Sequence, residues 1–176
     1  TFPEDAQRGT VIIGSGLAST RIFQAAVCMT DDSHFEGYAT GGSFCGESYP
    51  TPYKVYIAGE FNRPSVKRGI WRKDEVIPGS NFVEGPNSGF WFTFDANKEK
   101  TLLYRFAISY VSIENAKENL KADNLGWNFN DVVMRAENKW NDYLGRIDVE
   151  GRNQSRKQQF YTHLYHALIH PSLASD

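Results

Sequence analysis

The chain has 176 residues and a formal net charge of -2, with 19 lysines and arginines against 21 aspartates and glutamates. This length suits one domain or parts of two. The charge balance and the lack of a basic run argue against a nucleic-acid or anionic-membrane partner, and no apolar run is long enough to span a bilayer. A hydrophobic content of 40%, with 14% aromatic residues, excludes a disordered chain.

Residues 1–111 favour β-strands. Apolar and polar residues alternate over Tyr53–Phe61, Gly89–Phe94 and Leu102–Val111, and two further apolar runs cover Thr10–Ile13 and Ile22–Met29. Alternation with a period of two, bounded by Gly, Pro, Asn and Asp, is typical of antiparallel strands buried on one side. No long helical pattern separates these runs, so we predict an antiparallel β-sandwich rather than βαβ units.

The hydrophobic period changes to that of a helix at Ser112. The Ser112 hydroxyl is a good N-cap for a helix over Ile113–Ala122, because it accepts a backbone N–H of the first turn. Either Asn128 or Asn130 caps a second helix, in which apolar residues recur every three or four positions. The order of elements therefore predicts an α+β chain, with the strands first and the helices after them.

The two later helices have clear expected ends. Gly145 is placed for a left-handed C-cap of the second helix. The third helix runs to about His170, where Pro171 stops it. The start at Thr1 without a leader and the stop at Asp176 soon after a helical pattern suggest a piece cut from a longer protein.

Two cysteines and one sequon bear on the cellular compartment. Cys28 and Cys45 would form either a disulfide or two buried free thiols, and the count alone does not choose between them. Asn153-Gln154-Ser155 makes Asn153 a candidate glycosylation site. The sequon slightly favours a secretory pathway.

Two motifs hint at cofactors only weakly. Residues 14–19 begin like a dinucleotide-binding loop but lack the third glycine, and the following Arg21–Val27 has strand character, so a hairpin turn is favoured. His163, His166 and His170 share one face of a helix, as zinc ligands do. Hydrogen bonding or helix packing is the favoured role of these histidines.

Other local chemistry names no reaction. Exposed tryptophans such as Trp71 and Trp91 would stack on a sugar, although such residues in a sandwich more often belong to a core or an interface. Asp31-Asp32 is typical of a turn, because an aspartate side chain caps its own turn. No GxSxG motif marks a nucleophile.

An ordered set of motifs along the chain resembles glycoside hydrolase family 92, the calcium-dependent exo-acting α-mannosidases. The densest part of the resemblance follows Ser109 and ends in the segment from Phe160 to Asp176. The motifs that carry it are Tyr53-Lys54-Val55-Tyr56, Phe61-Asn62-Arg63-Pro64, Gly69-Ile70-Trp71, Ile108-Ser109-Tyr110-Val111-Ser112, Asn119-Leu120, Trp127-Asn128-Phe129, Trp140-Asn141 and Phe160-Tyr161-Thr162-His163-Leu164-Tyr165-His166.

The resemblance implies a β-sandwich, a helical linker and an (α/α)6-barrel catalytic domain. Residues 1–111 would form part of the N-terminal sandwich, residues 112–150 the linker, and residues 151–176 the start of the barrel with its first helix. The family removes terminal α-linked mannose with inversion, using a general acid and a general base, and calcium helps to hold the sugar. The full protein would be secreted or extracellular and act on mannose-containing glycans.

The resemblance assigns no catalytic residue or calcium ligand to this chain, because those of the family lie downstream, in the barrel. Tyr165, His166 and Asp176 are candidates for the lining of the substrate cleft. The chain alone is therefore expected to be inactive and to need the remainder of the polypeptide as its partner, with a large apolar face exposed when it stands alone. The alternative is a non-catalytic carbohydrate-binding β-sandwich with a helical tail.

Overall fold

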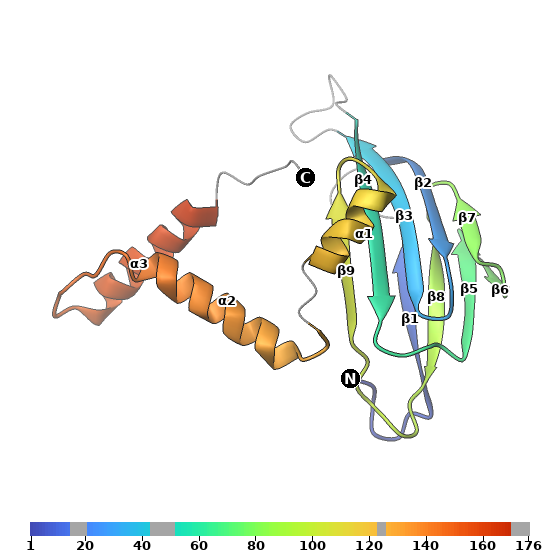
Figure 1. Ribbon diagram of the computed structural model, residues 1–176, viewed down its shortest axis with the longest axis horizontal. Helices are drawn as coiled ribbons and strands as arrows, with labels where there is room; N and C mark the ends of the chain where they lie inside the picture. The colour runs from blue at the N-terminus through green and yellow to red at the C-terminus, as the bar shows by residue number, and fades with distance from the viewer. Residues whose placement is uncertain (15–20, 43–51, 123–125, 170–176) are drawn as a thin grey trace. The chain divides into compact units, whose positions relative to one another are not determined.

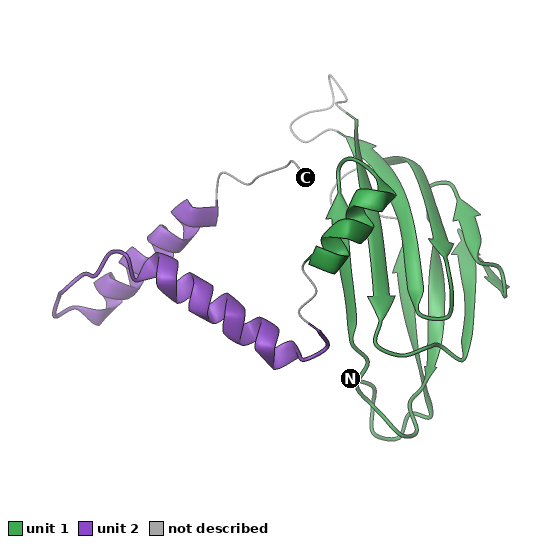
Figure 2. Ribbon diagram, viewed as in Figure 1, with its two compact units in different colours: residues 1–124, 176 green, residues 125–175 purple. Residues whose placement is uncertain are grey.

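The computed structural model describes residues 1–14, 21–42, 52–122 and 126–169. The chain divides into two compact units, with the boundary after Asn124 (Figure 2). The first unit contains the strands and one helix, and the second contains two helices (Figure 1). The order of elements confirms the predicted α+β class, with an antiparallel sandwich followed by helices.

Two antiparallel sheets form the first unit. The strands of the described residues are β1 (Arg8–Gly14), β2 (Arg21–Met29), β3 (His34–Gly42), β4 (Tyr53–Phe61), β5 (Lys67–Arg72), β6 (Glu75–Pro78), β7 (Phe82–Glu84), β8 (Ser88–Asp95) and β9 (Tyr104–Ser109). The smaller sheet has the order β1-β8-β5-β6, and the larger has the order β7-β2-β3-β4-β9. Strands β1 and β9 are therefore edge strands, one in each sheet.

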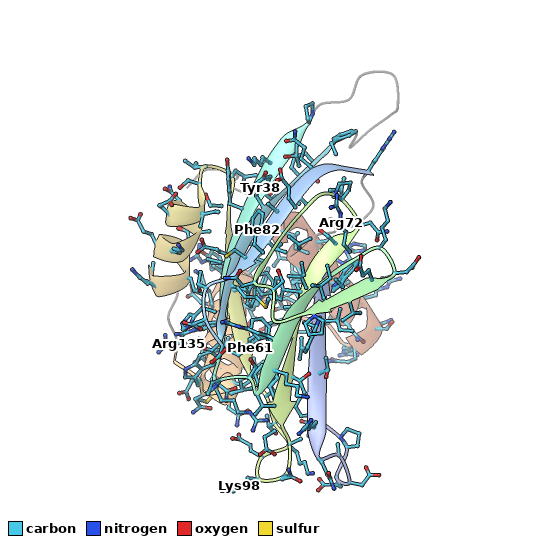
Figure 3. All side chains as sticks on the ribbon, turned by 90° about the vertical axis from the view of Figure 1, so that its right-hand side faces the viewer. Tyr38, Phe61, Arg72, Phe82, Lys98 and Arg135 are labelled. Carbon is cyan, nitrogen blue, oxygen red and sulfur yellow. The ribbon has the colours of Figure 1, made fainter. Side chains whose placement is uncertain are left out.

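The core lies between the two sheets and is rich in phenylalanine. Phe90, Phe92 and Phe94 occupy alternate positions of β8, so all three point inward from the smaller sheet. Phe61 of the larger sheet is labelled in Figure 3. Its ring centroid lies 5.2 Å from that of Phe92 and 4.9 Å from that of Phe94. Each fully buried phenylalanine contributes roughly 1.5–3 kcal/mol to folding, so this cluster holds the sheets together.

The sequence pattern missed four strands, β3, β5, β6 and β7. In β3 the inward positions are occupied by Phe35 and then by small residues, because neighbouring groups leave no room. A Cβ at Gly37 would lie 2.4 Å from the carbonyl oxygen of Ala26 and 2.8 Å from Cγ1 of Val27. The inward positions of β3 are therefore small for a steric reason and show no hydrophobic alternation. In β5 the two large apolar residues, Ile70 and Trp71, are adjacent, and β6 and β7 are too short to show a period.

Helix α1 (Ile113–Ala122) packs on the outer face of the larger sheet over β4 and β9 (Figure 1). Its predicted cap is present, since the N–H of Asn115 donates to Oγ of Ser112 at 3.0 Å. Ala116 is fully buried beneath the helix, and the Asn119 side chain donates to the carbonyl oxygen of Ile108 at 3.1 Å. The small alanine lets the helix approach the sheet closely.

The second unit consists of α2 (Phe129–Leu144) and α3 (Gln154–Ile169). Asn128 is the cap of α2, because its side chain accepts the N–H of Asn130 at 3.1 Å. The predicted left-handed cap at Gly145 is wrong: its φ of -73° is right-handed, and its N–H still donates to the carbonyl oxygen of Asn141 at 2.8 Å. The last helical hydrogen bond is therefore kept at Gly145.

The helices of the described residues include none that is both long and apolar enough to cross a membrane. Within this chain, α1 packs with the strands of the first unit. The predicted boundaries at residues 111 and 150 refer to the domains of the whole protein and stay a prediction.

Candidate functional site

A charged hollow of about 430 Å³ lies between α1 and the outer face of the larger sheet. The turn between β2 and β3, strands β3, β4 and β9, and α1 all contribute to its lining. Its polar and charged lining residues are Thr30, Asp31, His34, Glu36, Glu60, Arg105, Lys117 and Lys121. Acidic and basic side chains are thus gathered in one hollow by elements that are distant in the sequence.

His34 joins two carboxylates at the mouth of the hollow. Its Nδ1 lies 2.8 Å from Oδ2 of Asp31, and its Nε2 lies 3.0 Å from Oε2 of Glu60. A neutral imidazole has only one N–H to donate, so the ring donates to both carboxylates only when it is doubly protonated. Arg105 also contacts Glu60, with Nη2 at 2.5 Å and Nε at 2.6 Å from Oε1.

The Asp31 side chain is positioned by the turn that it caps. Its Oδ1 accepts the backbone N–H groups of Ser33 at 2.7 Å and of His34 at 2.8 Å, which confirms the predicted turn role. Partial burial acts to raise the pKa of Asp31, but the hydrogen bonds from the Ser33 N–H, the His34 ring and the His34 N–H outweigh it. Together they lower the pKa to about 2.

Lys117 connects the helix to this network. Its Nζ lies 2.5 Å from Oε2 of Glu36 on β3. Each of the three carboxylates that line the hollow therefore contacts a basic side chain, and two of them share one imidazole. This arrangement anchors α1, and it differs from the two carboxyl groups of a glycosidase, which face each other across the scissile bond.

The sequence offered no sign of this network beyond the aspartate pair. His34 and Glu60 are register partners on β3 and β4, and Arg105 pairs with Glu60 on β9. Only the strand register brings these three side chains together. Their separation along the chain hides the contact from any reading of local patterns.

The predicted cleft residues Tyr165 and His166 lie on α3. The Tyr165 ring contacts Trp140 of α2, with centroids 4.6 Å apart, and the His166 ring lies 5.7 Å from that of Tyr165. Tyr165 also lines a shallow hollow on α3 with Tyr161 and Thr162. Asp176 lies outside the described residues. The cleft role of these three residues stays a prediction.

Of the two cysteines of the candidate disulfide, the structure describes Cys28. Cys28 lies on β2 opposite Glu36, and burial, with a smaller contribution from the Glu36 carboxylate, raises the pKa of its thiol. Cys45 lies outside the described residues, so the disulfide stays a prediction.

The exposed Asn153 caps α3 through its side-chain oxygen, which accepts the N–H of Arg156 at 3.1 Å. The glycan-accepting nitrogen of Asn153 is not used in that bond.

The two weak cofactor motifs gain no support as sites. A strand, β2, follows the glycine-containing segment, as the turn interpretation expected, and residues 15–20 themselves lie outside the described part. His163 and His166 lie on α3, whereas His170 is not described. Among the residues that the structure describes, no three His, Cys, Asp or Glu side chains gather as a metal site requires.

Two models of glycosyl hydrolase domains match consecutive parts of the chain. The glycosyl hydrolase family 92 N-terminal domain covers residues 1–109, and the family 92 catalytic domain covers residues 115–176. The chain therefore belongs to glycoside hydrolase family 92, as the ordered motifs predicted. No curated protein matches it.

Solved structures show the same fold. The family 92 α-mannosidase BT3965 from Bacteroides thetaiotaomicron matches with a TM-score of 0.83 and 22% identity over 97% of this chain and 23% of its own. The inverting mannosidase BT2199 from B. thetaiotaomicron VPI-5482 matches with a TM-score of 0.81 and 22% identity over 97% of this chain and 22% of its own. The family 92 hydrolase ccman5 matches with a TM-score of 0.80 and 22% identity over 98% of this chain and 23% of its own. The chain thus spans less than a quarter of these proteins.

Proposed function

We propose that this chain is part of an α-mannosidase that removes terminal α-linked mannose from glycans with inversion at the anomeric carbon. The observation that carries the proposal is the consecutive match to the N-terminal and the catalytic domain of one hydrolase family. Two of the similar structures are mannosidases, and one of these is an inverting enzyme. The catalytic-domain match over residues 115–176 favours an enzyme over a stand-alone binding module.

The proposed chemistry needs two carboxyl groups on opposite sides of the sugar. In inverting enzymes they lie roughly 6.5–9.5 Å apart, with a water molecule between the base and the anomeric carbon. Asp31 and Glu60 instead point at the same imidazole, and Glu36 contacts Lys117. We therefore assign the general acid and the general base to the rest of the polypeptide, which leaves the 176-residue chain inactive by itself.

Calcium assistance is proposed for the whole enzyme only. Calcium binds about six to eight oxygen ligands, and its carboxylates must be free of other cations. The carboxylates of the charged hollow each contact a basic side chain, so they do not fit this ion. The calcium ligands would come from outside the described residues.

Exposed apolar edges support the remainder of the polypeptide as the partner. Tyr104 and Phe106 on the edge strand β9 are 58% and 52% exposed. These residues line an apolar hollow of about 280 Å³ between the two edge strands. In α2 and α3, none of the described residues is buried. Edges and helices of this kind are normally covered in a complete protein.

We propose that this enzyme is secreted. The exposed Asn153 at the start of α3 supports this location, since its sequon is accessible to a glycosyltransferase.

The test compares the complete polypeptide with the 176-residue chain on 4-nitrophenyl α-mannoside and on α-linked mannobiose. We expect the complete polypeptide to release mannose, to yield the β-anomer first by NMR, and to lose activity on chelation of calcium. The 176-residue chain should release no mannose. Hydrolysis by this chain alone, or no mannose release by the complete polypeptide, would contradict the proposal.

A further inference from the structure

Two tryptophans lie on the outer face of the smaller sheet. Strand β8 directs Phe90, Phe92 and Phe94 into the core, so Trp91 and Thr93 point to the opposite side. Trp71 of β5 pairs with Gly89 of β8, two pairs along from Gly69 and Trp91, so both tryptophans lie on the same face. The two indoles therefore sit diagonally across neighbouring strands, and both are half-buried.

Glycines beneath the indoles keep both rings flat against the sheet. A Cβ at Gly89 would lie 2.7 Å from Nε1 and 2.8 Å from Cε2 of Trp71. A Cβ at Gly69 would lie 2.7 Å from Cζ2 of Trp91. Any other residue at these positions would lift the ring. One face of each indole thus rests on the backbone, which leaves the opposite face directed away from the sheet.

Apolar and polar side chains border this pair. Ile12, the register partner of Trp91, is 69% exposed, and Val76, the partner of Trp71, is 61% exposed. On the other side of Trp91, the hydroxyl groups of Thr10 and Thr93 are 2.8 Å apart. The exposed Lys67 pairs with Thr93 in the register of β5 and β8. The face therefore joins a flat aromatic floor to hydroxyl and ammonium groups at one end.

This combination fits a sugar ring better than a protein surface. A pyranose presents flat C–H faces that stack on an aromatic plane and hydroxyl groups that need hydrogen-bond partners at the rim. Aromatic cover over a glycine also stabilises a sheet, which accounts for the inner face of each indole. It does not account for the exposure of two large apolar neighbours, Ile12 and Val76, beside the half-buried indoles. A patch of exposed apolar side chains marks a binding site.

We propose that Trp71 and Trp91 form a sugar-binding platform on which successive pyranose rings of a glycan chain stack, with the exposed Lys67 and Thr10 bonding to the sugar hydroxyls. The ligand class follows from membership of a glycoside hydrolase family, and the inference does not depend on the proposed hydrolysis. The platform would hold a long glycan on the enzyme, and a single mannose unit would gain nothing from it.

The experiment uses the complete polypeptide with α-mannan as the long probe and 4-nitrophenyl α-mannoside as the short one. Mannan binding is measured by calorimetry, and turnover is measured on both substrates. In W91A and W71A we expect mannan binding to weaken by about tenfold, the change that corresponds to ~1.4 kcal/mol for one lost stacking contact. The kcat/KM for the short substrate should stay unchanged.

Two further variants guard against a folding defect. Lys67→Ala changes an exposed rim residue and should weaken mannan binding while leaving the melting temperature unchanged. Phe82→Ala removes an exposed aromatic ring from β7 of the other sheet and should leave mannan binding unaltered. Calorimetry detects binding even if the polypeptide proves to have no hydrolase activity, so failure of the hydrolase proposal would leave this test intact.

Three results would overturn the platform. The first is wild-type mannan binding in W71A and W91A. The second is an equal loss of binding in Phe82→Ala. The third is complete shielding of Trp71 and Trp91 from acrylamide quenching in the sugar-free polypeptide, judged against W71F and W91F, because another part of the protein would then cover the face.

Discussion

Single glycines in the sandwich mark positions where a side chain touches the backbone of a neighbouring strand. A Cβ at Gly59 would lie 2.3 Å from Cζ of Phe35 and 2.9 Å from Cβ of Phe106. The Phe35 ring itself packs 5.0 Å from Phe90 in the core. The absence of one side chain on β4 is thus what allows a large ring from β3 to reach the opposite sheet.

Replacing this glycine tests the close approach. Gly59→Ala should lower the free energy of unfolding by about 1–3 kcal/mol, because the added methyl forces Phe35 out of its place in the core. Gly151→Ala is the matched control, since a Cβ there meets no atom within 4 Å. Urea unfolding measures both, and equal stability of the two variants would show that the core yields without cost.

The ionisation of Asp31 should make the free energy of unfolding depend on pH. The pKa of Asp31 falls from 3.8 to about 2 in the folded chain, so its ionised form stabilises the fold above about pH 4 and this contribution is lost as the pH falls toward 2. Asp31→Asn should therefore be less stable than the wild type at pH 7. The difference should shrink below pH 4, as measured by urea unfolding at a series of pH values. A constant difference from pH 7 to pH 3 would contradict this assignment.

At the scale of elements, helix α1 is attached to the larger sheet by one buried residue and several polar contacts. Ala116 is fully buried under the helix, and Lys117 reaches Glu36 on β3. A larger side chain at position 116 cannot be accommodated without moving the helix, since protein interiors are close-packed. The short side chain thus determines how near the helix lies.

Ala116→Leu and Ala122→Leu compare a buried and an exposed position of the same helix. The first should cost about 1–3 kcal/mol of unfolding free energy through overpacking, whereas the second should have almost no effect. Thermal unfolding followed by circular dichroism provides the measurement. If the two variants have the same melting temperature, α1 does not pack on the sheet as described.

Local patterns predicted the helices better than the strands. The caps are set by neighbouring residues, so the sequence predicted Ser112 and narrowed the second cap to Asn128 or Asn130, of which the structure has Asn128. Strand β3 was missed because Gly37 is small for a steric reason that involves β2. The contact between His34 and Glu60 requires the register of β3 with β4 and lies beyond any local pattern. The cleft role of Tyr165 and His166 rests on the family resemblance alone.

At the scale of the whole molecule, the apolar side chains of the edge strands contribute differently in the chain alone and in a complete enzyme. Phe106 on β9 is 52% exposed and lines the apolar hollow between β9 and β1. In the 176-residue chain it leaves apolar surface in contact with water. Under the proposed function, the rest of the polypeptide would bury the same ring.

Phe106→Thr should therefore affect the stability of the two forms to different extents. In the 176-residue chain we expect less self-association and little loss of stability, measured by analytical ultracentrifugation and urea unfolding. In the complete polypeptide the same change should cost about 2–4 kcal/mol, because it opens a cavity in a covered site. An equally small change in both forms would indicate that the ring stays exposed in the enzyme.

Strand β8 has a further consequence for folding accuracy. It carries large apolar rings on both faces, with Phe90, Phe92 and Phe94 inside and Trp91 outside. A slip of one residue in its pairing would exchange the two faces, so that Gly89, Trp91 and Thr93 would face the core in place of the three phenylalanines. Burial of apolar surface disfavours this register, because two large rings fewer would be buried. Shape adds to the preference, since Gly69 leaves space for the indole of Trp91 on the outer side of the sheet.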